Sequence, residues 1–135
     1  MFVSQSTRPS PILLEKDVTL AASSGTAVGI SVPAGTTVLA AGFENYTRVP
    51  DVATYTLDVT DGTTVFANDL NFDNTAPNTN RGGVVPGFIA AADTIDVVTT
   101  ISGSPGIIAG RVWAVVVDCS KGAQSADEVD RDQLA

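Results

Sequence analysis

The chain has 135 residues, of which 44% are hydrophobic and 16% are charged, and its formal net charge is −8. This length fits one domain that can bury a core without disulfides or metal, and the charge content is below the usual value of about a quarter. Nucleic-acid binding needs clustered Lys and Arg, whereas the seven basic residues here are scattered. No apolar run approaches the ~20 residues of a membrane span. We therefore expect no nucleic acid and no membrane among the partners.

The composition changes at both ends of the chain. Residues 1–11 are rich in Ser and Thr and contain Pro9 and Pro11, which favour extended backbone over a packed element. Residues 119–135 are polar and acidic, a composition that buries too little apolar surface to fold alone. We predict an extended N-terminal arm, a domain over residues 12–118 and an acidic C-terminal tail.

The first part of the domain is predicted to consist of strands. Residues 12–20 begin it, and residues 26–32 alternate between apolar and small or polar side chains, as in a half-buried strand. The sequence Pro-Ala-Gly at 33–35 predicts a turn. Residues 36–43 are then expected to pair with 26–32 as a hairpin.

The surest local prediction is the next pair of strands. Residues 53–60 alternate between an apolar face and a face of Thr and Asp, and residues 63–66 return. Between them stand Asp61 and Gly62, a strong hairpin signal because both residue types tolerate a positive φ.

A long polar stretch follows over residues 67–83, with Leu70 and Phe72 as apolar anchors. Loops of this length are uncommon in compact domains and are often binding or assembly loops. Residues 84–90 are expected to form an edge strand, because Pro86 interrupts them.

Two more strands complete the pattern. Residues 94–101 alternate, and residues 107–118 are the most hydrophobic strand, with Trp113 on one face and Ala114 on the other. Apolar residues on both faces indicate a central strand, or one whose outer face meets a partner.

About eight antiparallel strands predict an all-β fold, an antiparallel β-sandwich of jelly-roll type. Its core is predicted from the inward positions of the alternating segments. These residues are Val28, Ile30, Tyr55, Leu57, Val59, Ile95, Val97, Val112, Ala114 and Val116.

The residues that carry catalysis and metal binding are scarce. The absence of histidine excludes Ser-His-Asp and Cys-His catalysis and removes the commonest metal ligand. Asp58 and Asp61 are explained by a solvent-facing and a turn position. Residues 69–73 have the alternating oxygen donors of a Ca²⁺ loop but lack the Gly and Glu of the EF-hand pattern, which leaves ion binding by this loop open. We expect no enzymatic activity, no cofactor and no metal.

The single cysteine, Cys119, allows no intrachain disulfide and favours a reducing compartment. It follows an apolar strand and is expected at the margin of the core. The first residues lack the charged and apolar regions of a signal peptide. Asn45-Tyr46-Thr47 is a formal glycosylation sequon, which means little without a secretion signal.

Four stretches of the sequence resemble small β-sandwich structural proteins of tailed bacteriophages, including head decoration or cement proteins and some tail-associated modules. They are VPAGTTV at 32–38, TLDVTDG at 56–62, DTIDVV at 93–98 and AGRVWAVVV at 109–117. The resemblance implies a protein that docks on a capsid lattice, often as a dimer or trimer, and links neighbouring major capsid subunits. The family has no catalytic residues to carry over.

We therefore expect a non-enzymatic virion structural protein at the capsid surface, assembled in the host cytoplasm, that binds and stabilises the lattice of the major capsid protein. The alternative is a receptor- or glycan-binding module of a tail fibre or adhesin, which should show clustered loop aromatics. Expected partners are the major capsid protein and further copies of the chain, as a dimer or trimer. The residues expected to contact a partner are Phe2, Arg8, Pro9, Pro11, Leu70, Phe72, Arg81 and Trp113.

The arm and the tail lead to a first prediction. Deleting residues 1–11 or 119–135 should leave the melting temperature of the isolated protein nearly unchanged, because neither segment offers enough apolar surface to stabilise the fold. The same deletions should weaken co-sedimentation with undecorated capsids. Equal occupancy for all lengths of chain, or a sharp fall in melting temperature, would contradict the role of these segments as docking arms.

Overall fold

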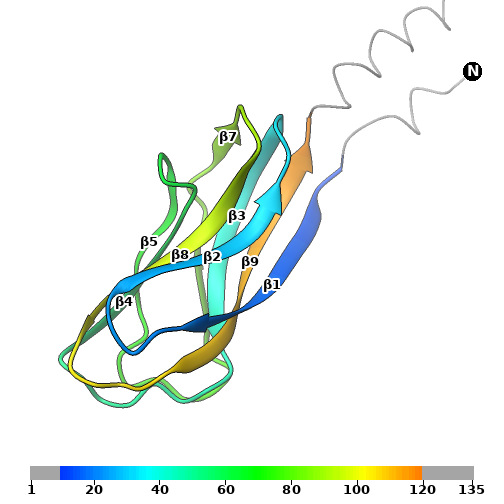
Figure 1. Cartoon of the computed structure of the whole chain (residues 1–135). Coiled ribbons are helices and arrows are strands. Elements are labelled where there is room, and N and C mark those ends of the chain that lie inside the picture. The colour runs from blue at the N-terminus through cyan, green and yellow to red at the C-terminus, as the bar shows by residue number, and fades with distance from the viewer. Residues whose placement is uncertain (1–9, 120–135) are drawn as a thin grey trace, which may run out of the picture.

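A computed structural model describes residues 10–119, and these form nine β-strands in two antiparallel sheets (Figure 1). The remainder of the predicted arm and tail lies outside the described residues. No helix among the described residues has the length and apolar character to cross a membrane. The strands are β1 (Ile12–Leu20), β2 (Gly25–Val32), β3 (Thr36–Asn45), β4 (Thr54–Thr60), β5 (Val65–Asn71), β6 (Asn80–Gly83), β7 (Gly87–Ile89), β8 (Asp93–Ser102) and β9 (Ile108–Asp118).

The strand pairs are nested along the chain. Strand β1 pairs with β9, β2 with β8, β3 with β6, and β4 with β5. A long antiparallel hairpin that rolls up on itself produces this nesting, which is the jelly-roll arrangement. The rolled chain divides into a β1-β9-β3-β6 sheet and a β2-β8-β4-β5 sheet, with the short β7 paired to β3 as the predicted edge strand. The predicted jelly-roll sandwich is confirmed.

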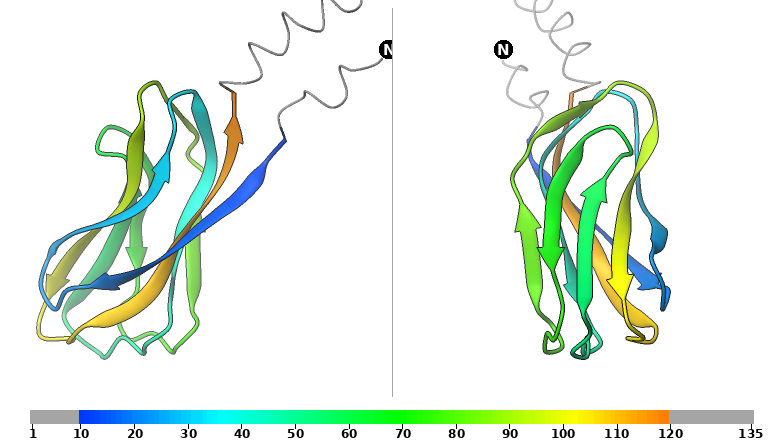
Figure 2. Two further views of the ribbon diagram at one scale, coloured as in Figure 1. Left: turned by 45° about the vertical axis from the view of Figure 1, so that its right-hand side comes forward. Right: turned by 90° about the vertical axis from the view of Figure 1, so that its left-hand side faces the viewer.

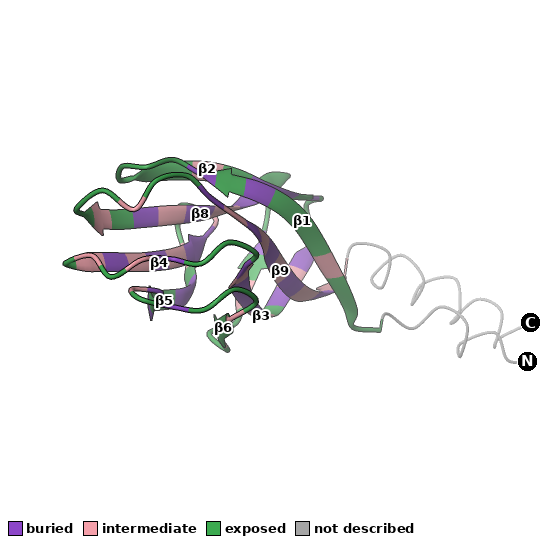
Figure 3. Ribbon diagram, turned by 90° about the horizontal axis from the view of Figure 1, so that it is seen from below, coloured by how far each residue is buried: buried purple, intermediate pink, exposed green. Residues whose placement is uncertain are grey.

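The two sheets lie face to face and enclose one core (Figure 2). Buried and less buried residues alternate along the central strands (Figure 3), because successive side chains of a strand point to opposite faces. The largest fully buried side chains come from both sheets and from the connection that follows β5; they include Leu20, Phe43, Tyr55, Leu57, Phe66, Phe72, Ile95 and Ile108.

Strand β9 is the central strand of the larger sheet, between β1 and β3. Its inward residues Val112 and Ala114 are completely buried, and Val116 is 2% exposed. The outward residues between them are half-buried. The predicted central place of this strand is therefore confirmed. A central strand still has one face on the outside of the sandwich, and the outward face of β9 is apolar.

One predicted core residue is wrong. Val28 is 61% exposed, because the register between β2 and β8 shifts between Ala27 and Ile30. This irregularity turns Val28 outward and buries Gly29, whose N–H donates to Oδ1 of Asp96 at 3.2 Å. Strict alternation holds only for an unbroken ladder, and a bulge adds one residue to the count. The other nine predicted core residues are 6% exposed or less.

The predicted hairpin of residues 26–32 and 36–43 is also wrong. Both segments form strands, but β2 pairs with β8 in one sheet whereas β3 pairs with β9 in the other. The turn at 33–35 therefore carries the chain from one sheet to the other. Strands that follow each other in the sequence often pair. Strands β2 and β3 do not, because pairing with distant strands closes the sandwich.

The polar stretch 67–83 is shorter as a loop than predicted. Strand β5 extends to Asn71 and β6 begins at Asn80, so only residues 72–79 connect them. Phe72 is completely buried and packs edge-on against Phe43, with ring centroids 5.5 Å apart. The polar sequence of β6, Asn-Arg-Gly-Gly, gave no hydrophobic signal because this short strand lies at the sheet edge.

Asn45 anchors the β5–β6 connection to β3. Its side chain is completely buried, and its Nδ2 donates to the carbonyl oxygens of Thr47 and Ala76 at 2.9 and 3.0 Å. Its Oδ1 accepts from the N–H of Thr79 at 2.9 Å. The asparagine of the formal glycosylation sequon is thus a structural residue, inaccessible on the folded domain.

The hairpin of β4 and β5 is confirmed, but its loop has four residues rather than two. Thr60 pairs with Val65, and Gly62 has a φ of 94°, which only glycine adopts readily. Oδ1 of Asp61 accepts hydrogen bonds from the N–H groups of Thr63 and Thr64 at 2.9 and 2.7 Å.

One polar group in the core has no partner. The hydroxyl of Tyr55 is buried without a hydrogen bond among the described residues, and the burial raises the pKa of Tyr55 to about 12. Leaving a buried hydroxyl unsatisfied costs free energy, so the value of this residue to the fold lies in the apolar area of its ring.

The corrected core leads to a stability prediction with an internal control. Leu57→Ala should lower the free energy of unfolding by ~2–5 kcal/mol, because the side chain is fully enclosed and its loss leaves a cavity. Val28→Ala, at the exposed position, should change it by less than ~0.5 kcal/mol. Urea unfolding of the two variants measures both values, and similar losses would contradict the assignment of Leu57 to the core and of Val28 to the exposed face of β2.

Candidate interaction surface

The outer face of the β1-β9-β3-β6 sheet carries an unusual number of apolar side chains. Residues directly opposite each other on paired strands share a face, so the register places the outward residues in rows across the sheet. The rows nearest the start of β1 are mostly apolar. We call their large side chains the outer apolar surface, which consists of Leu13, Leu39, Phe88, Trp113, Val115 and Val117.

Three of these side chains are open to solvent. Leu13 is 56% exposed, Leu39 is 38% exposed and Phe88 is 60% exposed. Leu39 lies at the register shift of β3 between Val38 and Ala40, and such a bulge turns an extra side chain outward. Large apolar groups that gather on one exposed face are typical of an interaction site.

Trp113 lies across two glycines of the neighbouring strands. A methyl group added to Gly42 would stand 2.5 Å from its Cζ2 atom, and one added to Gly82 would stand 2.6 Å from the same atom. No side chain other than hydrogen leaves room for the indole at these two places. Its Nε1 donates to Oδ1 of Asn80 at 2.8 Å, so the ring is held flat against the sheet and is already ordered before any partner binds.

Charged side chains border the apolar surface towards the other end of the sheet. Arg111 on β9 binds Glu15 on β1 and Glu44 on β3, with N–O distances of 2.7 and 2.8 Å. Burial by itself would lower the pKa of Arg111, but the hydrogen bond to Glu44 and the charges of both carboxylates outweigh it and raise the pKa. The three charges link three strands and fix their register on this face.

A tyrosine extends the polar border. The hydroxyl of Tyr46 donates to Oδ1 of Asp17 at 2.7 Å, and this hydrogen bond raises the pKa of Tyr46 above its ordinary value. The apolar rows therefore end at a row of satisfied polar groups, which is the layout of an interface core with a polar rim.

The outer face of the opposite sheet has a different character. The outward positions of β4 and β8 carry mostly Thr and Asp, among them Thr54, Thr56, Asp58, Thr94 and Asp96. Val28 is the one large apolar residue there that exceeds half exposure among the described residues. The sandwich thus presents a hydroxyl-rich face on one side and an apolar, aromatic face on the other.

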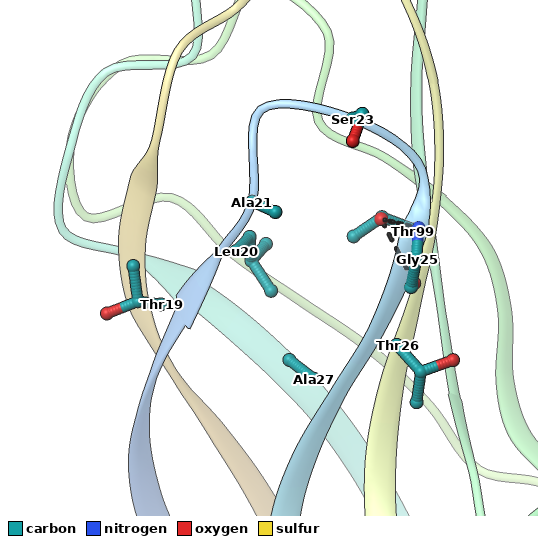
Figure 4. Close-up of a pocket in the computed structure, with 8 residues that line it drawn as sticks. All are labelled: Thr19, Leu20, Ala21, Ser23, Gly25, Thr26, Ala27 and Thr99. Carbon is teal, nitrogen blue, oxygen red and sulfur yellow. Dashed lines mark hydrogen bonds between the residues drawn. The ribbon is translucent and has the colours of Figure 1, made fainter.

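A small hollow lies under the β1–β2 connection (Figure 4). Its volume is 130 Å³, and its lining contains no charged residue and no thiol. The hydroxyl of Thr99 is engaged with the N–H and the carbonyl oxygen of Gly25 at 3.0 and 3.2 Å. Ligand pockets are usually ~300–1,000 Å³ and hold convergent polar groups, so this hollow has neither the size nor the chemistry for a substrate.

The side-chain oxygens of Asn71 and Asp73 hold the backbone, and Oδ2 of Asp69 accepts from Nδ2 of Asn68 at 3.5 Å. Oδ1 of Asn71 accepts from the N–H of Asp73 at 2.9 Å, and Oδ1 of Asp73 accepts from the N–H of Val52 at 2.7 Å. Within residues 10–119, no three His, Cys, Asp or Glu side chains gather in a way that could hold a metal ion. Cys119 is half-buried, with its Sγ 3.6 Å from Oγ1 of Thr37.

The predicted contact residues fall into three groups. Phe2, Arg8 and Pro9 lie outside the described residues. Leu70 and Phe72 are buried in the core, so their side chains are not available to a partner on this fold, contrary to expectation. Pro11, Arg81 and Trp113 remain at the surface; Arg81 lies over the ring of Phe72, 5.8 Å from its centroid, and only Trp113 belongs to the outer apolar surface.

Sequence reasoning missed the exposed members of this surface. Leu13 lies in a segment predicted only as the start of the domain, and Phe88 lies in the predicted edge strand 84–90, which Pro86 interrupts. A signal was present in β9, whose outward residues are as apolar as its inward ones. What the sequence lacked was the identity of the strands beside β9.

Comparisons with known proteins show a likeness of fold without a likeness of sequence. No family model and no curated protein matches the chain. A chain of the Cyanophage Pam1 capsid asymmetric unit superposes with a TM-score of 0.57 at 14% identity, covering 81% of this chain and 85% of that chain. A chain of the acidic stable capsid structure of Helicobacter pylori bacteriophage KHP30 gives 0.55 at 12% identity, with 82% and 93% covered. These two structural neighbours are phage capsid structures, and the chain shares their fold.

The glycine cradle of Trp113 leads to a spectroscopic prediction. Gly82→Ala should lift the indole off the sheet, because the new Cβ would stand 2.6 Å from it. The chain has one tryptophan, so its emission should shift to longer wavelength and its quenching by acrylamide should increase. Gly25→Ala is the matched control, since a Cβ there meets nothing within 4 Å. Unchanged quenching in a folded Gly82→Ala variant would contradict the packing of Trp113.

Proposed function

We propose that this chain is a non-enzymatic virion structural protein that binds a capsid lattice and stabilises it in the manner of a head cement or decoration protein. The outer apolar surface is the side that faces the lattice of the major capsid protein. The observation that carries the proposal is the asymmetry of the sandwich: one outer face is apolar, aromatic and bordered by ion pairs, and the opposite one is covered with Thr and Asp.

The apolar face has the properties of a docking surface. Its side chains Leu13, Leu39 and Phe88 are partly exposed to solvent unless a partner covers them. Burial of a fully exposed side chain of this size contributes roughly 1.5–3 kcal/mol, and covering the exposed part of each contributes a share of that. Trp113 is held in place by its glycines and by Asn80, so binding costs it little side-chain entropy. Preorganised aromatic residues in such a setting are common binding hot spots.

The Thr- and Asp-rich face supports the same orientation. A protein on a capsid surface has one side against the shell and one side towards water, and a hydroxyl-rich acidic face suits the second role. The outward carboxylates Asp58 and Asp96 then face water and add to the repulsion between particles.

The chemistry of the described residues fits a binding role. On the outer face, Glu15 and Glu44 both form ion pairs with Arg111. The lining of the hollow beside Thr99 has no acid or base, and the hydroxyl of Thr99 is engaged with Gly25. The fold shared with two phage capsid structures supports a virion setting, and further copies of the chain on the same lattice are its expected neighbours.

The proposal predicts that attachment depends on one face of the sandwich. Phe88→Asp should weaken binding to undecorated particles of the major capsid protein by about tenfold or more. The change removes a ring that the partner would bury and introduces a charge into a contact without water. The measurement is a co-sedimentation titration, with thermal unfolding run in parallel.

Val28→Asp is the matched control, because Val28 is 61% exposed and Phe88 is 60% exposed, on opposite outer faces. It should bind like the unaltered protein. If Val28→Asp weakens attachment and Phe88→Asp does not, the orientation is reversed. If the unaltered protein fails to co-sediment and binds glycans or cell surfaces instead, the protein is an adhesin module and the proposal is wrong.

A further inference from the structure

We infer that the free edge of β1 is the site where two copies of this chain pair, antiparallel and through residues 12–14, so that two sheets join into one. This inference extends the proposed function, on which it rests for the setting of the dimer, to a defined contact between copies. The pairing itself requires no capsid.

The edges of the two sheets are not equally protected against strand pairing. Strand β6 has four residues and β7 has three. Strand β2 is interrupted by a register shift, and β5 by two shifts and by Asp69, whose φ is 53°. Short strands, bulges and irregular residues are the devices that prevent edges from adding further strands.

Strand β1 is neither short nor bulged, and its charged residues, which are another such device, are confined to Glu15, Lys16 and Asp17, beyond residues 12–14. It pairs with β9 over nine consecutive residues without any shift, and among the described strands none pairs with its other side. A long, regular edge presents a row of unpaired N–H and C=O groups, which are a template for another strand.

The first residues of β1 are also exposed to solvent rather than covered by the rest of the sandwich. Ile12 is 49% exposed and Leu13 is 56% exposed, although adjacent residues of a strand point to opposite faces. Figure 2 shows this end of β1 projecting beyond the other strands, and Figure 3 shows it largely exposed. At the far end of the strand, Val18 and Leu20 are buried. Apolar residues exposed on both faces of one strand end indicate a segment that something else covers.

The charges of β1 select one register for pairing with a second copy. A two-fold axis at Lys16 would place Lys16 opposite its own copy and Glu15 opposite Asp17, which are unfavourable like-charge pairs. An axis at Leu13 places Leu13 opposite Leu13 and Ile12 opposite Leu14. Every pair in this central segment is then apolar, and Pro11, which has no N–H to donate, ends the ladder.

The occupant is a second copy because the edge complements itself. The segment Ile-Leu-Leu pairs with its own antiparallel image in apolar contact on both faces, and an edge pairing of this kind is isologous, as most dimer contacts are. The two-fold axis is perpendicular to the sheet, so both outer faces lie on the same side. The two outer apolar surfaces then form one continuous surface that contacts a lattice at two places, which multiplies weak contacts.

The test is a covalent cross-link between position 13 of two copies, made in a variant that also carries Cys119→Ser. Opposed residues of an antiparallel pair have Cα atoms roughly 4.5–5.5 Å apart, within the range that a disulfide spans. Leu13→Cys should therefore give a covalent dimer on mild oxidation or with a short bismaleimide. Thr19→Cys, exposed on the same strand, should remain monomeric, because the proposed register separates its two copies by ~40 Å.

Sedimentation without cross-linking provides the second measurement. The unaltered protein should associate to dimers as concentration rises, and Leu13→Asp should raise the dissociation constant at least tenfold by placing two charges at the axis. A monomer at the highest soluble concentration, or equal cross-linking at positions 13 and 19, would overturn the inference. Either result leaves capsid attachment through Phe88 to be judged by its own titration, so the two proposals fail separately.

Discussion

The register of β9 is the constraint on which the larger sheet depends. This strand lies between β1 and β3, and its alternation sends Val112, Ala114 and Val116 into the core. A slip by one residue would exchange the two faces and force the indole of Trp113 into a closely packed interior. Two outward features oppose such a slip: Arg111 binds carboxylates on both neighbouring strands, and Trp113 fits only where glycines face it. The side chains that form the candidate surface therefore also hold the sheet in register.

The same sheet shows how a structural protein can be built to bind before it meets its partner. The aromatic ring is locked, the arginine is held by two carboxylates, and Tyr46 is tied to Asp17. These groups have already lost their side-chain entropy on folding, so a partner that covers them gains contact area at low cost. Leu13, Leu39 and Phe88 add the apolar area that no part of the described chain covers. The opposite face carries mostly Thr and Asp, so the two outer faces of the domain differ in chemistry.

The start of β1 and the end of β9 lie side by side at one corner of the sandwich, where Ile12 pairs with Val116 (Figure 1). Ile12 and Leu13 expose apolar area at this corner, and both ends of the described chain leave from it. A contact between copies at β1 and attachment through the adjacent outer face would use one continuous area. Individually weak contacts of this kind become firm when they repeat across a lattice, which suits a small acidic domain better than one deep binding pocket would.

The sequence by itself determined the elements of this protein. Alternation identified the buried faces of β4, β8 and β9, and Asp61 and Gly62 identified the turn between β4 and β5. The lack of histidine directed attention to binding. These signals are local, because side-chain direction and turn geometry depend on a few adjacent residues. Which strands become neighbours was decided only by the tertiary structure. Residues 33–35, expected as the turn of a hairpin, connect the two sheets instead. A bulge turns Val28 outward, and Phe72, expected in a loop, is buried in the core. The outer apolar surface was also decided by the tertiary structure. Its residues Leu13, Leu39, Phe88 and Trp113 come from four strands, and only long-range pairing brings them onto one face.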